Sequence, residues 1–249
     1  MSFPLITLDP RENLPHPALA VNKRANILAR IREALRVPAS RPGVHSAPGQ
    51  RVATHEQKPT DFKPWLPAVG ASFDERVALF AKNAAELKAG FQLLASRDDL
   101  AAKLSALAQA EGWKKIGTHA GEMTNFIFAT LGLPVVQTDS LYKTEELETC
   151  DAAITECDAL VAQTGTVVLT ARSAGGRALS ILPPHHVVLA RREQLLPDLP
   201  AAFALLKQRY ADNYPSMMCL ITGPSRTGDI ERILVLGAHG PKKLTIFCV

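Results

Sequence analysis

The order of helix-like and strand-like segments predicts an α/β domain built on a mixed, mostly parallel sheet with helices on both faces. From residue 71 to residue 249, apolar residues at helical spacing alternate with short β-rich runs. Runs at residues 159–163 and 166–171 flank a tight turn, which predicts a hairpin and makes the sheet mixed. A hydrophobic share of 47% in 249 residues is enough for one sizeable core.

Residues 1–70 are predicted to form an N-terminal helical arm, separate from the domain at residues 71–249. Ile27, Ile31 and Leu35 recur at helical spacing, which predicts an amphipathic helix over residues 23–35. Prolines recur through the rest of the arm and apolar periodicity is almost absent, which is typical of a long linker. The helix can pack on its own domain or on a second subunit, and the sequence leaves both open.

The first half of the domain has local signals for three helices and two short strands. Ser72 is a helix cap, and Asp98 or Asp99 starts a second helix. Helices are expected at residues 72–87, 98–110 and 121–131, and strands at residues 115–118 and 134–138.

The second half is richer in strands. Beyond the hairpin, we expect β-rich runs at residues 179–182 and 186–190, a helix at 195–210, a strand at 217–222, a helix at 230–236 and a last strand at 244–249. The run at residues 217–222, MMCLIT, is continuously apolar and predicts a strand buried at the centre of a sheet.

Charge and the lack of apolar runs exclude two classes of protein. The 28 basic and 24 acidic residues give a net charge of +4, and the basic ones are scattered in pairs. A nucleic-acid binder gathers them on one face among aromatic residues. No run is long enough to span a membrane, and residues 1–8 lack the basic start of a secretory signal, so a cytoplasmic protein is expected.

The four cysteines do not form a metal-binding pattern. None are spaced C-x-x-C, and no Cys/His cluster has the spacing of a zinc or iron–sulfur site, so no metal or cofactor is expected on this chain. Cys219 and Cys248 lie in apolar runs and are expected to be reduced core residues. Cys150 and Cys157 are the one pair to test for a disulfide.

The segment TGPSRTGDIE, residues 222–231, carries the strongest local signal for a ligand site. It follows a predicted strand and leads into a predicted helix, and anions bind at the carboxyl ends of strands and at helix N-termini. The same residues also fit a helix cap with acids in the first turn, so binding and capping both remain open. The candidate ligand-binding residues here are Gly223, Ser225, Arg226, Thr227 and Asp229.

Other loops add candidates. His239, in LGAHGP, is the candidate catalytic residue because a loop histidine can act as general base, anion ligand or proton donor, although it also fits a turn. Thr164, Gly165 and Thr166 can bring backbone close to a ligand or simply form the hairpin turn. The THAGE loop at residues 118–122 is a third possibility, in which its glutamate also fits as a first-turn helix acid.

Two patterns argue against common enzyme sites. His185 and His186 are adjacent on a predicted strand, so they point in opposite directions and are not expected to hold one metal together. The sequence has no G-x-S-x-G elbow, no P-loop and no G-x-G-x-x-G, so a standard dinucleotide or ATP site is unsupported.

From about residue 151 to residue 249 the chain resembles the LUD domain of the lactate-utilization protein C family. The resemblance is carried by AQTGT at 162–166, LPPHHVV at 182–188, QLLPDL at 194–199, ITGPSRTGDIE at 221–231 and LGAHGP at 236–241. The opening helix, ILARIREAL, also looks like the start of such proteins. Residues 38–150 match only in their general rhythm of helices and strands.

The resemblance implies a fold similar to the sugar-phosphate isomerase and CoA-transferase group. It also implies a non-redox subunit that works with two partner subunits, which hold the iron–sulfur clusters, in oxidising L-lactate to pyruvate. The C-terminal loops would then bind a small carboxylate or phosphate ligand or a partner, with Arg226 as anion contact and His239 as proton acceptor. Two alternatives stay open: a stand-alone enzyme acting on acyl-CoA or sugar phosphate, and a purely structural or regulatory module.

Overall fold

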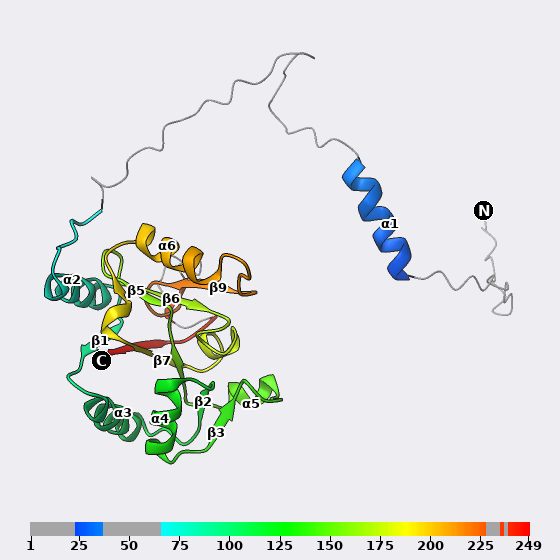
Figure 1. Ribbon diagram of the computed structural model, residues 1–249. Helices are drawn as coiled ribbons and strands as arrows, with labels where there is room; N and C mark the ends of the chain where they lie inside the picture. The colour runs from blue at the N-terminus through cyan, green and yellow to red at the C-terminus, as the bar shows by residue number, and fades with distance from the viewer. Residues whose placement is uncertain (1–22, 37–65, 228–234, 237–238) are drawn as a thin grey trace, which may run out of the picture. The chain divides into compact units, whose positions relative to one another are not determined.

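The computed structural model describes residues 23–36, 66–227, 235–236 and 239–249, and the chain divides into two units at residues 1–60 and 61–249 (Figure 1). The first unit contains helix α1 (Lys23–Arg36), which confirms the predicted N-terminal helix. Within the described ranges, no helix is both long and apolar enough to cross a membrane.

A six-stranded parallel sheet forms the frame of the second unit. Its strand order is β1-β12-β7-β4-β2-β3, and every neighbouring pair runs parallel. The strands are β1 (Gly90–Leu93), β2 (Ile116–Thr118), β3 (Val135–Gln137), β4 (Ala152–Glu156), β7 (His185–Ala190) and β12 (Lys243–Cys248). All carboxyl ends therefore lie along one edge of this sheet.

A second, four-stranded sheet has the order β8-β5-β6-β9. It consists of β5 (Ala159–Val161), β6 (Thr166–Thr170), β8 (Leu195–Leu196) and β9 (Met218–Ile221). The predicted hairpin is confirmed, because β5 and β6 pair antiparallel around Gly165, whose φ of 65° suits glycine. The prediction of one mixed sheet was wrong: the hairpin belongs to this separate sheet. A two-stranded ribbon, β10 (Arg226–Thr227) with β11 (Val235–Leu236), follows β9.

Three of the helices begin after a residue whose side chain accepts a free backbone N–H group. Ser72 forms a capping box with Glu75 at the start of α2 (Phe73–Glu86). Ser96 caps α3 (Arg97–Glu111), and Asp198 caps α6 (Leu199–Tyr210). Within the described residues, the other helical segments are α4 (Glu122–Leu131), α5 (Thr144–Glu148) and the 3₁₀ turns η2 (Ala178–Ser180) and η3 (Arg192–Gln194).

The two sheets and the helices pack as layers around separate clusters of apolar side chains. Helices α3 and α4 cover one face of the parallel sheet, where Leu104, Ile127 and Leu189 are buried together. Helix α2 and the second sheet cover the opposite face around Val188 and Leu160. Helix α6 packs on the outer face of the second sheet (Figure 1). Helices thus lie on both faces of the parallel sheet, as predicted, but a second sheet lies there as well.

Four predicted elements differ from the structure. The run at 217–222 is not a central strand: β9 lies at a sheet edge, with Met218 47% and Leu220 40% exposed. Residues 178–180 form a 3₁₀ turn instead of a strand, and helix α6 starts at Leu199 because residues 195–196 pair as a strand. A helix was expected at residues 230–236, but its last two residues form strand β11. Residues 230–234 lie outside the described ranges.

Candidate functional site

The predicted C-terminal loops come together in one place. Ser225 donates its backbone N–H to the carbonyl of Pro241 at 3.0 Å, which joins the loop after β9 to the loop before β12. A groove of about 420 Å³ opens beside them. We call it the amino-end groove, and its lining includes Arg177, Ile181, His186, Met217, Leu220, Gly223, Ser225, His239 and Leu244. Three of the predicted residues, Gly223, Ser225 and His239, therefore share one groove.

The QTGT turn is connected to this region by hydroxyl groups. Thr164 Oγ1 lies 2.7 Å from Thr166 Oγ1, which lies 2.8 Å from Thr222 Oγ1. Thr222 also lines the amino-end groove. The turn residues themselves do not line it, and Gly165 instead packs against helix α2 near Asn83.

The other predicted residues are arranged differently from the expectation. Arg226 and Thr227 form strand β10, not the start of a helix, so the proposed anion site at a helix N-terminus is absent at these residues. The Arg226 guanidinium points back to the carbonyl of Thr222, at 3.5 Å, and does not line the groove. Asp229 lies outside the described residues.

The amino-end groove lies at the amino ends of the parallel strands, whereas the site was expected at their carboxyl ends. His186 and Leu244 are register partners at the starts of β7 and β12, and both line the groove. The expectation that the loop after residue 221 lies at the carboxyl ends of parallel strands was wrong, because β9 belongs to the second sheet and pairs antiparallel with β6.

At the carboxyl ends of the parallel strands the structure places a different and more polar cavity. His119 follows β2, Glu156 ends β4 and Arg191 follows β7. They surround a cavity of about 320 Å³, which we call the carboxyl-end cleft. The rest of its lining is Ala120, Gly121, Cys157, Asp158, Arg172, Ser173, Gln194, Arg209 and Tyr210. In open α/β sheets this is the edge at which ligands bind.

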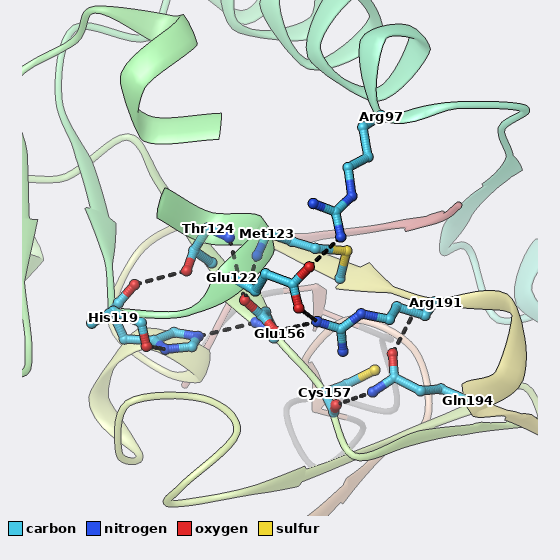
Figure 2. A network of polar contacts seen from close by, with 10 residues as sticks. Arg97, His119, Glu122, Met123, Thr124, Glu156, Cys157, Arg191 and Gln194 are labelled. Carbon is cyan, nitrogen blue, oxygen red and sulfur yellow. Dashed lines mark hydrogen bonds and ion pairs between the residues drawn. The ribbon is translucent and has the colours of Figure 1, made fainter. Parts of the chain in front are cut away.

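Glu156 is fixed by the start of helix α4. Its Oε1 accepts the backbone N–H groups of Met123 at 2.8 Å and Thr124 at 3.3 Å (Figure 2). Helix α4 has glycine at its N-cap and no side-chain cap of its own, so Glu156 supplies the cap from a neighbouring strand. A Cβ on Gly121 would meet the Glu156 carboxylate and lie 2.8 Å from Thr124 Oγ1, so this contact requires glycine.

Arg191 is held between carboxylates (Figure 2). It lies 2.7 Å from Glu122 Oε2 and 3.8 Å from Glu156 Oε2, and Glu122 also bonds Arg97. The hydrogen bond from Arg97 and then the charge of Arg191 hold the pKa of Glu122 below its ordinary value. Glu122 was expected to be a first-turn helix acid. It is that, and it also orients an arginine at the cleft.

His119 holds two backbone groups at the cleft. It is 2% exposed, its Nε2 accepts the N–H of Glu156 at 3.1 Å, and its Nδ1 lies 3.0 Å from the carbonyl of Ala120. These partners require the neutral tautomer with the proton on Nδ1. Gly175, with φ of 60°, packs so closely against the His119 side chain that any Cβ added to the glycine would clash with the His119 Cβ.

Asp158 lies two residues after Glu156, where the chain enters the second sheet. It is fully buried, and its Oδ1 accepts bonds from Arg209 and from the Tyr210 hydroxyl, each at 2.7 Å. Burial and the bond to Asp158 help to raise the pKa of Tyr210, so the hydroxyl keeps its proton. The Arg172 guanidinium lies over the Tyr210 ring at 5.3 Å.

The two adjacent histidines point in opposite directions, as predicted. His185 Nε2 lies 2.8 Å from Thr245 Oγ1, and His186 Nε2 lies 2.9 Å from Thr155 Oγ1. Burial lowers the pKa of His185 to about 4 and that of His186 to about 3, so both are neutral near pH 7.

The cysteines lie in different parts of the fold. All four are free; Cys150 packs near Leu147, whereas Cys157 and Cys248 are buried between the two sheets and Cys219 is on β9. Burial raises the pKa of Cys157, and that of Cys248 to about 11, so these thiols stay protonated. Among the described residues, no group of three or more His, Cys, Asp or Glu side chains has the arrangement of a metal site.

Sequence reasoning missed most of the carboxyl-end cleft. Only the THAGE loop was noted, and Glu156, Asp158, Arg172 and Arg191 were not. The sequence did contain a signal for this site, because a polar residue ends or directly follows each of three buried, mutually parallel strands. Strand β4 itself was not recognised, so the position of Glu156 at its end was not apparent.

Comparison with known proteins agrees with this arrangement of a parallel sheet and a smaller second sheet. The model of the LUD domain matches residues 77–249, and the chain therefore belongs to the LUD domain family. A crystal structure of a DUF162 family protein from Deinococcus radiodurans shares the fold, with a TM-score of 0.59 and 22% identity, over 72% of this chain and 99% of that one.

The names of several related proteins are more specific than the name of the LUD domain family. Lactate utilization protein C of Bacillus licheniformis is 35% identical over 107 residues, which are 42% of this chain and 45% of that protein. The protein of the same name from Macrococcus caseolyticus is 38% identical over 104 residues, 41% of this chain and 45% of that protein. The matched part thus spans about half the length of these curated relatives.

Proposed function

We propose that the chain is a non-redox subunit of an iron–sulfur complex that oxidises L-lactate to pyruvate. The observation that carries the proposal is the similarity to several proteins named lactate utilization protein C, within a match to the LUD domain over residues 77–249. The function named for those relatives is lactate utilization. The iron–sulfur partners follow from the family resemblance of the sequence.

The thiols of this chain support a role without its own cluster. An iron–sulfur cluster needs several thiolates that converge on it. Here Cys150 and Cys157 belong to separate packed clusters, and burial raises the pKa of all three buried thiols, those of Cys150, Cys157 and Cys248. The electron carriers are therefore proposed to lie in partner proteins.

The amino-end groove is the surface we propose for contact with a partner or small anion at the C-terminal loops. It combines the predicted residues Gly223, Ser225 and His239 with apolar side chains such as Leu220, and apolar grooves with a few polar groups are typical binding surfaces. His239, exposed at its rim, remains the candidate proton acceptor there.

The test is recovery of the tagged full-length protein from its own cells grown on lactate, followed by mass spectrometry. Co-purification of iron–sulfur proteins, together with lactate-dependent reduction of an added dye by the complex, is the expected result. Recovery of the protein alone, with full lactate oxidation in cells that lack it, would contradict the proposal.

A second candidate function, a stand-alone transferase or isomerase, is favoured by one observation. Glu156 is a carboxylate at the carboxyl end of a parallel strand, held by two backbone N–H groups, and only 13% exposed. Such a preorganised carboxylate is a suitable nucleophile or base. Turnover of an acyl-CoA or a sugar phosphate by the isolated protein, lost in Glu156→Gln, would support this alternative.

A further inference from the structure

The carboxyl-end cleft contains an unsatisfied hydrogen-bond acceptor. Asp158 is fully buried and lines the cleft, its Oδ1 takes both neighbouring donors, and its Oδ2 has no partner among the described residues. A buried carboxylate oxygen without a donor costs free energy, and such an exception points to a missing group. The missing group is a hydrogen-bond donor.

A second acceptor lies close in sequence and lines the same cavity. Glu156 Oε1 is occupied by the backbone of α4, but the nearest cation to its Oε2 is Arg191 at 3.8 Å, which is too long for a hydrogen bond. The cleft thus presents two carboxylates that each retain an oxygen for a donor.

Three arginines, Arg172, Arg191 and Arg209, also line the cleft. Arg191 and Arg209 are paired with carboxylates, whereas the Arg172 side chain bonds a backbone carbonyl, that of Asn213 at 2.9 Å. Arginine binds carboxylates in a planar, two-pronged way, so a ligand with a carboxylate group fits this charge.

We propose that the carboxyl-end cleft binds a small hydroxycarboxylate, with its carboxylate on Arg172 and Arg191 and its hydroxyl group donated to Asp158 or Glu156. The volume of about 320 Å³ lies at the small end of the range for ligand sites and suits a molecule of a few carbon atoms. This assignment rests on the proposed function for the choice of a hydroxyl donor, and it places the ligand away from the C-terminal loops.

Calorimetric titration of the full-length protein separates the two parts of the proposal. L-lactate tests the whole pattern, propionate and pyruvate lack the hydroxyl donor, and inorganic phosphate tests general anion binding. We expect L-lactate to bind about tenfold or more tightly than propionate or pyruvate, since a hydrogen bond to a buried charged group is lost in both. Equal affinities for all four anions would overturn the role of the acceptors.

Variants locate the site. Arg172→Gln removes an exposed cation of the cleft and is expected to weaken L-lactate binding about tenfold or more. Lys207→Gln removes one exposed positive charge from α6 outside the cleft and is the matched control, expected to leave binding unchanged. Asp158→Asn and Glu156→Gln each change one of the two acceptors, and one of these variants is expected to lose the preference for L-lactate over propionate, whereas retention of the preference in both would overturn the role of the acceptors. If these variants do not fold, the comparison of Arg172→Gln with Lys207→Gln still decides the location.

The result also separates this proposal from the proposed function. Co-purification with iron–sulfur proteins but no binding of L-lactate overturns the cleft assignment and leaves the subunit role intact. Binding that survives Arg172→Gln but is lost in Ser225→Ala would move the ligand to the amino-end groove and overturn the cleft assignment. Binding of L-lactate in the cleft, combined with recovery of the protein from its cells without any iron–sulfur partner, would support the cleft assignment and count against the subunit role.

Discussion

The amino-end groove and the carboxyl-end cleft lie at opposite ends of the same parallel strands, and their polar groups are held in different ways. In the groove, Ser225 and His239 belong to loops joined by a backbone bond, and apolar side chains form much of the lining. In the cleft, Glu156, Arg191 and Asp158 are each fixed by partners from another element. Groups fixed in this way are preorganised. Substitutions in the cleft should therefore lower the free energy of unfolding more than substitutions in the groove.

The largest effect is expected from Asp158→Ala in the cleft. It leaves the buried Tyr210 hydroxyl and the Arg209 guanidinium without their shared carboxylate. We expect a loss of about 3 kcal/mol in the free energy of unfolding, because the buried Tyr210 hydroxyl and the partly exposed Arg209 guanidinium each lose a hydrogen bond to a charged group. Urea denaturation measures it. A loss below about 1 kcal/mol would mean that water replaces the carboxylate.

A matched pair of glycines compares the two regions directly. Gly121→Ala should cost about 2 kcal/mol, because the new Cβ pushes Glu156 off the start of α4. Gly240→Ala, beside Ser225 in the groove, should cost about 0.5 kcal/mol, since its Cβ would lie 3.1 Å from the Ser225 Cβ and the loop can shift. Thermal denaturation of both variants tests this prediction. Equal losses in the free energy of unfolding would contradict the proposed difference between the cleft and the groove.

The amino ends of the strands should respond to acid through their two buried histidines. Folding lowers the pKa of His185 to about 4 and of His186 to about 3, so the unfolded chain binds more protons below its ordinary histidine pKa of about 6.5. The contribution of these two histidines to the free energy of unfolding is therefore fully present above that pH, and it is lost as the pH decreases from about 6.5 towards 4. Each histidine contributes a slope of up to about 1.4 kcal/mol per pH unit.

The contribution of one histidine can be isolated by substitution. His186→Gln should reduce the slope of the unfolding free energy between pH 6.5 and 5 by about half. Carboxylates with lowered pKa values, such as Glu111 and Glu122, act only at more acidic pH. An unchanged slope in the variant would show that His186 is not the titrating group.

The smallest effect is expected at an ion pair on the surface near the same strand ends. Lys243 at the start of β12 bonds Glu111 at 2.6 Å, but the Lys243 side chain is 55% exposed. Glu111→Gln should therefore cost about 0.5 kcal/mol or less, and less still in high salt. A cost above about 1 kcal/mol would show that His185, buried beside this pair, depends on it.

Most of the elements were predictable because their signals are local. Ser72 with Glu75 marks α2, and the glycine turn marks the β5–β6 hairpin. The strand Ala152–Glu156 was missed because it is short and has two alanines, with no alternation of apolar and polar residues. The run at 217–222 was placed at a sheet centre because an apolar composition does not reveal whether a neighbouring strand is present on each side.

The site was less predictable than the fold because it depends on pairing across the sheet. Residues 223, 225 and 239 were predicted as candidates in two separate loops near the C-terminus, and the structure places them in the lining of one groove. Their relation to the parallel strands was not apparent, because membership of the second sheet is decided by tertiary contacts. His119, Glu156 and Arg191 come from distant parts of the chain, and only the strand order β7-β4-β2 makes them neighbours.

Strands β4 and β7 are adjacent in the parallel sheet, yet the chain builds the β5–β6 hairpin of the second sheet between them. Glu156 ends a strand of the first sheet, and Asp158 stands where the second sheet begins, only two residues later. A molecule held by both carboxylates would therefore tie the two sheets together at the point where the chain crosses. Its binding should slow hydrogen exchange of backbone amides in β5, β6 and α6, far beyond the atoms it touches.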